Sequence, residues 1–208
     1  GYGKIPITEI FERSSNTGMV QAIYNEYNSK PEDFVNRLMN MGLSEPLGLP
    51  IVGEAKPFIP HPDKKGWSGI SLPWMAYGYG VSMTPMQTLT FYNAVANDGV
   101  MVRPRFIEGT QNIRSQIKKQ SDVEIINPSI CSKETIGKVK SMLKGVVEKP
   151  WGTAHNIYDP NFAISGKTGT CQLDYNKDEV QYVASFVGYF PSDQPKYSCI
   201  VVIHRPDK

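Results

Sequence analysis

Two short motifs bring together hydroxyl, amide and amine side chains that can act in acyl transfer. They are Ser14-Ser15-Asn16 and Gly166-Lys167-Thr168-Gly169-Thr170. Acyl transfer at a peptide carbonyl needs a nucleophile, proton carriers, an oxyanion hole and a clamp for the substrate carboxylate. The residue types in the two motifs suit all of these roles except that of an activated nucleophile. The motifs therefore predict most of an acyl-transfer site.

The two motifs differ in how often composition alone would produce them. In a random chain of this composition, Ser-x-Asn is expected roughly once and Lys-Ser/Thr-Gly roughly 0.2 times. Order and context add weight, because Asn16 opens an expected helix and Lys167 opens an expected strand. Taken alone, Ser14 is more often a helix cap and Lys167 a surface lysine.

Other strings resemble the transpeptidase domain of the penicillin-binding proteins, and the resemblance runs through nearly all 208 residues. They are Phe11-Glu12-Arg13 before the first motif, Tyr77-Gly78-Tyr79-Gly80, Thr84-Pro85-Met86-Gln87, Ala94-Val95-Ala96-Asn97-Asp98-Gly99, Gly152-Thr153-Ala154, and Ser165 before the second motif. The resemblance is closest to the high-molecular-weight, division-type class that builds septal peptidoglycan. In that family a Ser-x-x-Lys motif carries the nucleophile and completes the set.

The resemblance implies catalytic roles for three residues. Ser14 would carry a proton to the leaving nitrogen, and Asn16 would hydrogen-bond the substrate amide and neighbouring groups. Lys167 would polarise Ser14 and stabilise the negative charge that develops during the reaction.

It also implies that the second motif binds the substrate. The hydroxyls of Thr168 and Thr170 would hold a stem-peptide or β-lactam carboxylate, since alternate strand residues share one face. Gly169 would leave room for the ligand backbone. The backbone N–H of Thr170 would donate to the oxyanion.

The Ser-x-x-Lys motif does not occur before Ser14, where the family order would place it. Two matches lie elsewhere, Ser115 to Lys118 and Ser141 to Lys144, which is about the number expected by chance. Ser141 falls in the middle of an expected helix, where its N–H is already bonded and cannot serve an oxyanion. Ser115 lies in a polar run that offers nothing to desolvate Lys118. We expect neither serine to be catalytic.

Composition bounds the remaining possibilities. The chain is 40% hydrophobic and 20% charged with a net charge of +2, so it can form a core and has no basic excess for nucleic acid. No apolar run approaches the roughly 20 residues of a membrane span. Cys131, Cys171 and Cys199 have no metal or disulfide spacing and are expected to be buried thiols. No metal or other cofactor is expected.

Periodicity predicts the elements that position the motifs. Helices are expected over 17–27, 31–41, 84–99 and 133–149, and β-strands over 167–173, 182–190 and 197–204. Short strands are expected around a polar stretch in 100–130. Residues 43–82 lack a period, and their Trp67, Trp74, Tyr77 and Tyr79 either wall a groove or pack the loop. The fold class is α+β, an antiparallel sheet flanked by helices, as in penicillin-binding proteins and β-lactamases.

The expected function is that of a peptidoglycan D,D-transpeptidase that β-lactams acylate. By resemblance, residues 1–208 would be the C-terminal part of its transpeptidase domain, with the nucleophile, a pedestal and any membrane anchor upstream. Its partners would be stem peptides, β-lactams and, through other regions, cell-division proteins, at the extracytoplasmic face of the bacterial membrane. The alternatives are a β-lactamase or β-lactam sensor of the same fold, and a non-catalytic binding fragment.

Overall fold

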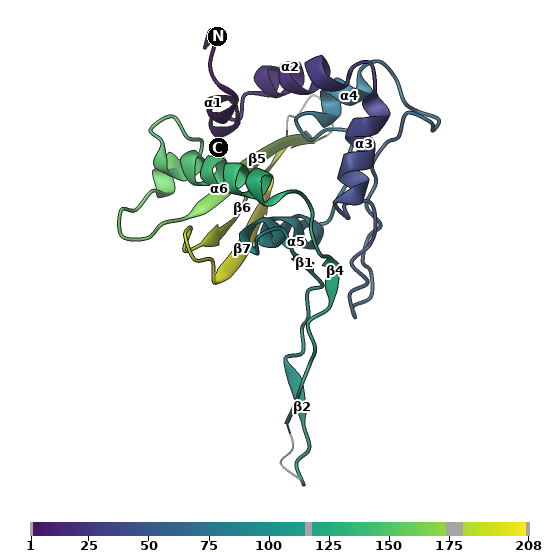
Figure 1. The fold of residues 1–208 in the computed structure, drawn as a ribbon, viewed down its shortest axis with the longest axis vertical. Coiled ribbons are helices and arrows are strands. Elements are labelled where there is room, and N and C mark those ends of the chain that lie inside the picture. The colour runs from purple at the N-terminus through teal and green to yellow at the C-terminus, as the bar shows by residue number, and fades with distance from the viewer. Residues whose placement is uncertain (1, 115–117, 174–180, 207–208) are drawn as a thin grey trace.

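A three-stranded antiparallel sheet forms the centre of the protein. The computed structural model describes residues 2–114, 118–173 and 181–206. The sheet has the order β5-β6-β7, and helices α5 and α6 pack against it (Figure 1). In the view of Figure 1, α1 and α2 lie above α6, and α4 and α3 lie to its right. The expected α+β class, with an antiparallel sheet flanked by helices, is confirmed.

The elements follow one another as a block of helices, a set of short strands, a long helix and the sheet. The helices are α1 (Ile7–Glu12), α2 (Asn16–Tyr27), α3 (Pro31–Asn40), α4 (Ser71–Met75), α5 (Pro85–Ala96), α6 (Lys133–Glu148) and a 3₁₀ turn η1 (His155–Ile157). The strands are β1 (Met101–Val102), β2 (Gly109–Gln111), β3 (Lys118–Gln120), β4 (Ile125–Asn127), β5 (Ser165–Leu173), β6 (Gln181–Phe190) and β7 (Tyr197–His204).

Local capping explains where the two sheet-packing helices begin. At α5 the Thr84 hydroxyl accepts a hydrogen bond from the Gln87 N–H at 3.1 Å, and the Gln87 side chain accepts from the Thr84 N–H at 2.7 Å. This reciprocal capping box satisfies two N–H groups that a helix start leaves without a partner. At α6 the Ser132 hydroxyl accepts from the Thr135 N–H at 3.2 Å.

The main core lies between α5, α6 and the sheet. Ala94 and Val95 of α5 meet Ile136 and Leu143 of α6 over the ring of Tyr189 in β6, which is 1% exposed. A smaller cluster of Val146, Val147 and Ala154 packs α6 and the following turn against Phe11 of α1. The same helix thus contacts both β5 and α1. The first motif follows α1 and the second lies on β5. Because α6 contacts both elements, it fixes the position of the two motifs relative to each other.

Glycines allow β5 and β6 to approach closely at the start of the second motif. Gly166 and Gly188 are paired across the two strands. A Cβ atom on Gly188 would collide with the backbone of Ser165 and Gly166, and one on Gly166 with Phe186 and the Val187 carbonyl. The absence of side chains here therefore fixes the path of β5 just before Lys167.

The elements expected from the sequence are found, together with α1, α4 and the 3₁₀ turn η1, which were not expected. The four long helices and the three long strands lie where their patterns predict them. Helix α1 was not expected, because six residues are too few for a visible period. Helix α4 interrupts the irregular stretch 43–82 for five residues.

The three cysteines are free thiols, as expected, but the expectation that they are buried is wrong. Cys171 and Cys199 are exposed and Cys131 is half-buried. Cys171 lies on β5 and Cys199 lies on β7. Small apolar character alone therefore did not decide their burial.

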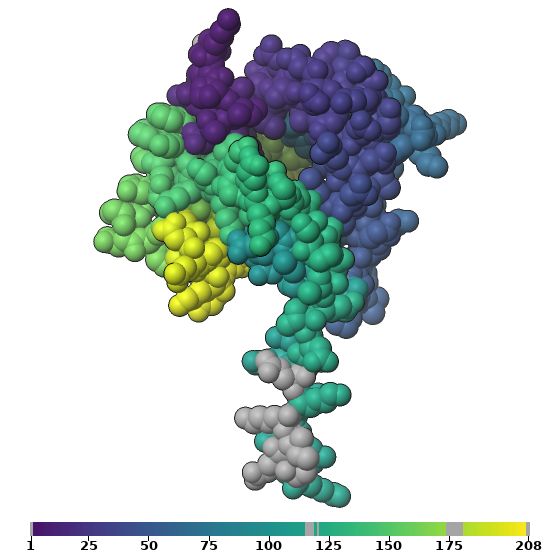
Figure 2. All heavy atoms as spheres, viewed as in Figure 1, coloured from purple at the N-terminus to yellow at the C-terminus, as the bar shows by residue number. Residues whose placement is uncertain are grey.

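The short strands form two ribbons beyond α5. β1 pairs with β4, and β2 pairs with β3 in an antiparallel hairpin that stands away from the body (Figures 1 and 2). In the part of the chain that the structure describes, no helix is long and apolar enough to cross a bilayer.

The turn after α6 should be sensitive to a single methyl group. A Cβ atom on Gly152 would collide with the carbonyl groups of Val146 and Gly145, which are backbone and cannot rotate away. We expect Gly152→Ala to lower the free energy of unfolding by about 1–3 kcal/mol, the usual cost of overpacking. Thermal or denaturant unfolding measures it.

Gly137→Ala is the matched control, since Gly137 lies inside the preceding helix α6, is exposed and has open space at its Cβ position. It should raise the free energy of unfolding by about 0.5–1 kcal/mol. Equal effects of both substitutions would show that the turn accommodates a side chain.

Candidate active site

The first motif forms the corner between α1 and α2. The Ser15 hydroxyl caps α2 by accepting a hydrogen bond from the Gly18 N–H at 3.3 Å. The interpretation of Ser14 as that cap is therefore wrong, because the cap lies one residue later. Ser14 itself takes a left-handed backbone with φ of 52°, which turns the chain sharply out of α1. A non-glycine residue in this region is uncommon and is found where surrounding structure holds it.

The corner leaves the two reactive side chains of the motif at the surface. Ser14 and Asn16 are both exposed. Backbone bonds hold the turn: the Ser14 N–H donates to the Phe11 carbonyl at 3.0 Å and the Ser15 N–H donates to the Ile10 carbonyl at 2.9 Å. The side chains of Ser14 and Asn16 make no hydrogen bond to other described residues. They are thus available to a ligand.

The second motif lies at the start of β5, paired residue by residue with β6. Lys167 is opposite Val187, Thr168 opposite Phe186 and Thr170 opposite Ala184. Lys167 and Thr168 are half-buried, whereas Gly169 and Thr170 are exposed. A paired strand has little conformational freedom, so these groups have a defined position.

The amine of Lys167 is placed in an apolar setting. Its Nζ lies 5.9 Å from the centre of the Phe11 ring and donates to the carbonyl of Thr168 at 3.0 Å. Burial lowers the pKa of Lys167 to about 8, because desolvation disfavours the charged form. No carboxylate of the described residues forms an ion pair with it. An anion entering the site would therefore find an unneutralised positive charge.

A single cavity of about 510 Å³ joins the two motifs. Its wall contains all six residues expected from the sequence, namely Ser14, Asn16, Lys167, Thr168, Gly169 and Thr170. Residues so far apart in the chain meet because α6 contacts both α1 and β5. The structure thus brings together every predicted site residue, while their individual roles stay predictions.

Aromatic residues close another side of this cavity. Tyr77 and Tyr79 line it, with ring centres 5.3 Å apart. The Tyr79 hydroxyl accepts a hydrogen bond from the Gln172 N–H at 3.1 Å, which ties the loop to β5. Tyr92 of α5 also lines the cavity, and burial raises its pKa to about 12, so its hydroxyl stays neutral. For Tyr77 and Tyr79, the groove-wall interpretation is confirmed.

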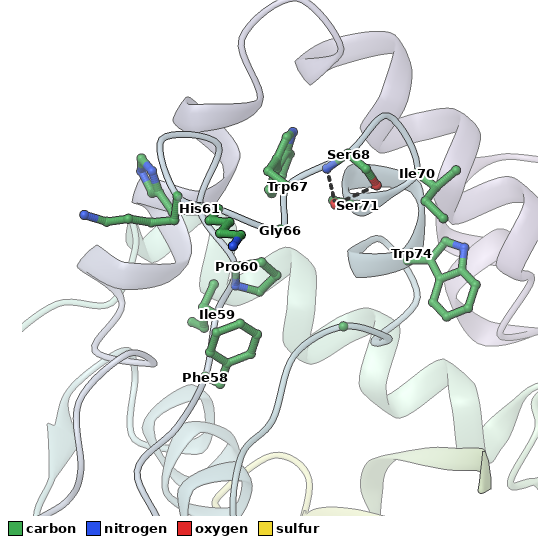
Figure 3. A pocket seen from close by; sticks show the side chains of 13 residues that line it. Phe58, Ile59, Pro60, His61, Gly66, Trp67, Ser68, Ile70, Ser71 and Trp74 are labelled. Atoms are coloured by element: carbon green, nitrogen blue, oxygen red, sulfur yellow. Dashed lines mark hydrogen bonds between the residues drawn. The ribbon is translucent and has the colours of Figure 1, made fainter. Parts of the chain in front are cut away.

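The two tryptophans of the same loop line a different groove. Figure 3 shows Trp67 and Trp74 around a hollow of about 300 Å³ with Phe58, Pro60 and Ile70. None of the six motif residues reaches it. The Trp74 ring meets Tyr79 edge-on at 5.7 Å between centres, so the two hollows share the wall formed by the loop.

Sequence reasoning missed one polar neighbour of the second motif. The hydroxyl oxygens of Thr153 and Thr168 are 2.6 Å apart. Thr153 lies in the turn between α6 and η1, and its only sequence signal was the short Gly-Thr-Ala string. Phe11 and Glu12 had a similar signal, since they belong to the Phe11-Glu12-Arg13 string before the first motif.

The chance Ser-x-x-Lys match that begins at Ser141 lies outside the cavity wall. Ser141 is exposed in the middle of α6, as expected. Ser115 lies outside the described residues. No group of His, Cys, Asp and Glu within 2–114, 118–173 and 181–206 has the arrangement of a metal site.

Known proteins resemble this chain over its whole length. The family described as the penicillin binding protein transpeptidase domain matches residues 1–208. Penicillin-binding protein PbpB of Mycolicibacterium smegmatis is 31% identical over 100% of this chain and 33% of its own length. Peptidoglycan D,D-transpeptidase FtsI of Buchnera aphidicola is 27% identical over 96% of this chain and 33% of its own.

The fold agrees with the sequence match. The crystal structure of penicillin-binding protein 3 from Mycobacterium tuberculosis, complexed with aztreonam, superposes with a TM-score of 0.81 at 29% identity. The match covers 96% of this chain and 45% of that one. This chain spans about a third of the length of the two curated relatives above. The chain belongs to the penicillin-binding protein transpeptidase family.

Proposed function

We propose that this chain supplies most of the active site of a serine-type peptidoglycan D,D-transpeptidase, which β-lactams acylate in the same cavity. The observation that carries the proposal is the convergence of six motif residues from the α1–α2 corner and β5 on one cavity. The nucleophile is a Ser-x-x-Lys serine from outside these 208 residues. The 208-residue chain alone is therefore inactive.

Acylation uses the groups in the order that their chemistry allows. The serine oxygen attacks the peptide carbonyl as its proton passes to the amine of the same Ser-x-x-Lys motif, and the carbonyl oxygen becomes an oxyanion that accepts a hydrogen bond from the Thr170 N–H. The charge of Lys167 stabilises this intermediate. When the carbon–nitrogen bond breaks, Ser14 passes a proton to the departing nitrogen, and Asn16 holds the substrate amide.

Transfer completes the reaction with a second substrate. The amine of another stem peptide attacks the ester and gives up a proton, the carbon–oxygen bond to serine breaks, and the serine oxygen takes up that proton through the same groups. A β-lactam stops at the ester, because the leaving nitrogen stays tethered to the acyl group. The substrates are stem peptides in the cell wall, so the reaction belongs at the extracytoplasmic face of the membrane. Division proteins that bind other regions are further proposed partners.

The lifetime of the penicillin adduct tests the proposal against its alternatives. Protein that carries the Ser-x-x-Lys segment with this chain should form a fluorescent penicillin adduct that survives for many minutes and should cross-link stem peptides. Rapid release of the label would indicate a β-lactamase. A stable label without cross-linking would indicate a sensor, and the absence of any label would indicate a binding module. The 208-residue chain is the control and should stay unlabelled. A penicilloyl mass on Ser115 or Ser141 would contradict the assignment of the nucleophile.

The charge of Lys167 predicts a pH dependence. Its amine is protonated below a pKa of about 8 and loses the proton above it, so its stabilisation of the oxyanion is lost as pH rises through 8. The second-order rate constant of acylation, which reports the free enzyme, should fall there. Lys167→Ala should lower this constant by roughly 100-fold or more at pH 7, the scale of a lost oxyanion stabiliser.

Lys167→Arg is the control for this pH dependence, because a guanidinium keeps its charge. In Lys167→Arg, the fall of the acylation rate constant with pH should move to higher pH, even if the rate constant itself is lower. An identical fall near pH 8 in wild type and Lys167→Arg would assign the titration to another group.

The two threonine hydroxyls predict selectivity for a carboxylate. Thr168→Val and Thr170→Val should each slow acylation by a carboxylate-bearing penicillin about ten-fold or more, since a hydrogen bond to a charged group contributes roughly 1.5–3 kcal/mol. A β-lactam ester without the free carboxylate should react almost unchanged, because the Thr170 N–H is backbone. Equal losses with both probes would rule out a carboxylate clamp.

A further inference from the structure

Thr153 and Thr168 come from different elements but share one short hydrogen bond. Their hydroxyl oxygens are 2.6 Å apart, where Thr168 lies on β5 and Thr153 lies in the turn that follows α6. Thr168 lines the cavity, whereas Thr153 does not belong to its wall. Thr153, which is itself exposed, thus lies next to the hydroxyl that the proposed clamp uses but outside the cavity wall.

Each threonine hydroxyl has only one proton, so this bond can run in two directions. If Thr168 donates to Thr153, the Thr168 proton is used and its oxygen presents only lone pairs to the cavity. If Thr153 donates to Thr168, the Thr168 proton is free to point at a ligand. A carboxylate accepts hydrogen bonds and donates none, so it selects the second direction. In this direction the two bonds also polarise each other, which strengthens the outer one.

The main chain of Thr153 is held firmly enough to play this part. Its N–H donates to the carbonyl of Glu12 at 3.2 Å, and the next residue, Ala154, donates to the Val146 carbonyl at 3.1 Å. Gly152 has no room for a side chain. The turn is therefore fixed to both α1 and α6.

A hydrogen bond between side chains also links this turn to α1. The Trp151 indole N–H donates to the Glu12 carboxyl group at 2.6 Å. Glu12 lies two residues before Ser14, so one set of contacts positions the Ser14 corner and the donor next to Thr168 together.

We propose that Thr153 is a positioning residue that directs the Thr168 hydroxyl toward the carboxylate of the acyl donor and so contributes to substrate specificity. The inference rests on the proposed function, since it assumes that Thr168 binds this carboxylate. It adds that the clamp has three hydroxyls, of which the Thr153 hydroxyl acts only through its neighbour.

Isosteric and conservative substitutions of Thr153 test this role in protein that carries the Ser-x-x-Lys segment. Thr153→Val keeps the shape but removes the donor, and should slow acylation by a carboxylate-bearing penicillin about three- to ten-fold, the factor that a neutral hydrogen bond supplies. The β-lactam ester should react at the wild-type rate. Thr153→Ser keeps a hydroxyl and should restore most of the rate with penicillin. Thermal unfolding of each variant reports its fold separately.

A double-mutant cycle separates positioning from a merely structural effect. Thr153→Val should cause little further loss in the Thr168→Val background, because the group through which it acts is already gone. Thr110→Val, on the exposed hairpin strand β2, is the matched control and should change neither rate. Additive losses, equal losses with both probes, or an unchanged penicillin rate in Thr153→Val would each overturn the inference.

These outcomes also separate this inference from the proposed function. If Thr168→Val discriminates between penicillin and the ester but Thr153→Val does not, only the role of Thr153 fails. If Thr168→Val itself does not discriminate, the proposed clamp fails, and the role of Thr153 fails with it.

Discussion

The buried carboxyl group of Glu12 is the contact on which the site geometry depends. Glu12 is 6% exposed, and a buried carboxyl group is costly unless hydrogen bonds compensate it. The Trp151 indole N–H donates one such bond to the carboxyl group. The main-chain carbonyl of Glu12 separately accepts a hydrogen bond from the Thr153 N–H. The carboxyl group also packs against Gly145, where no side chain would fit. One residue at the end of α1 therefore joins α1, α6 and the turn that follows α6.

This connection explains why two motifs from opposite ends of the chain share a cavity. Ser14 follows Glu12 by two residues and is held with a left-handed backbone that would be unfavourable alone. α6 packs against β5, and the close approach at Gly166 and Gly188 fixes β5 to β6. The positions of both motifs are thus fixed relative to the same helix, α6. Catalytic groups need such support, because small displacements cost large factors in rate.

The electrostatics of the cavity suit an anionic ligand. Lys167 lies beside the Phe11 ring and has no carboxylate partner among the described residues. Its lowered pKa of about 8 records the cost of keeping a charge in this apolar setting. A ligand carboxylate or a developing oxyanion would relieve that cost. The same amine would be far less effective in water or in an ion pair.

Sequence alone determined the features that depend on near neighbours. The capping box of Thr84 and Gln87, the apolar stripe of α6 and the β-rich runs of the sheet involve residues within a few positions of each other, so their patterns predicted the elements. The motif strings likewise predicted six of the residues that line the cavity. Tertiary structure decided the exposure of Cys171 and Cys199, the lowered pKa of Lys167 and the pairing of Thr153 with Thr168. Each of these depends on what packs against a residue from a distant part of the chain, and no local pattern records that.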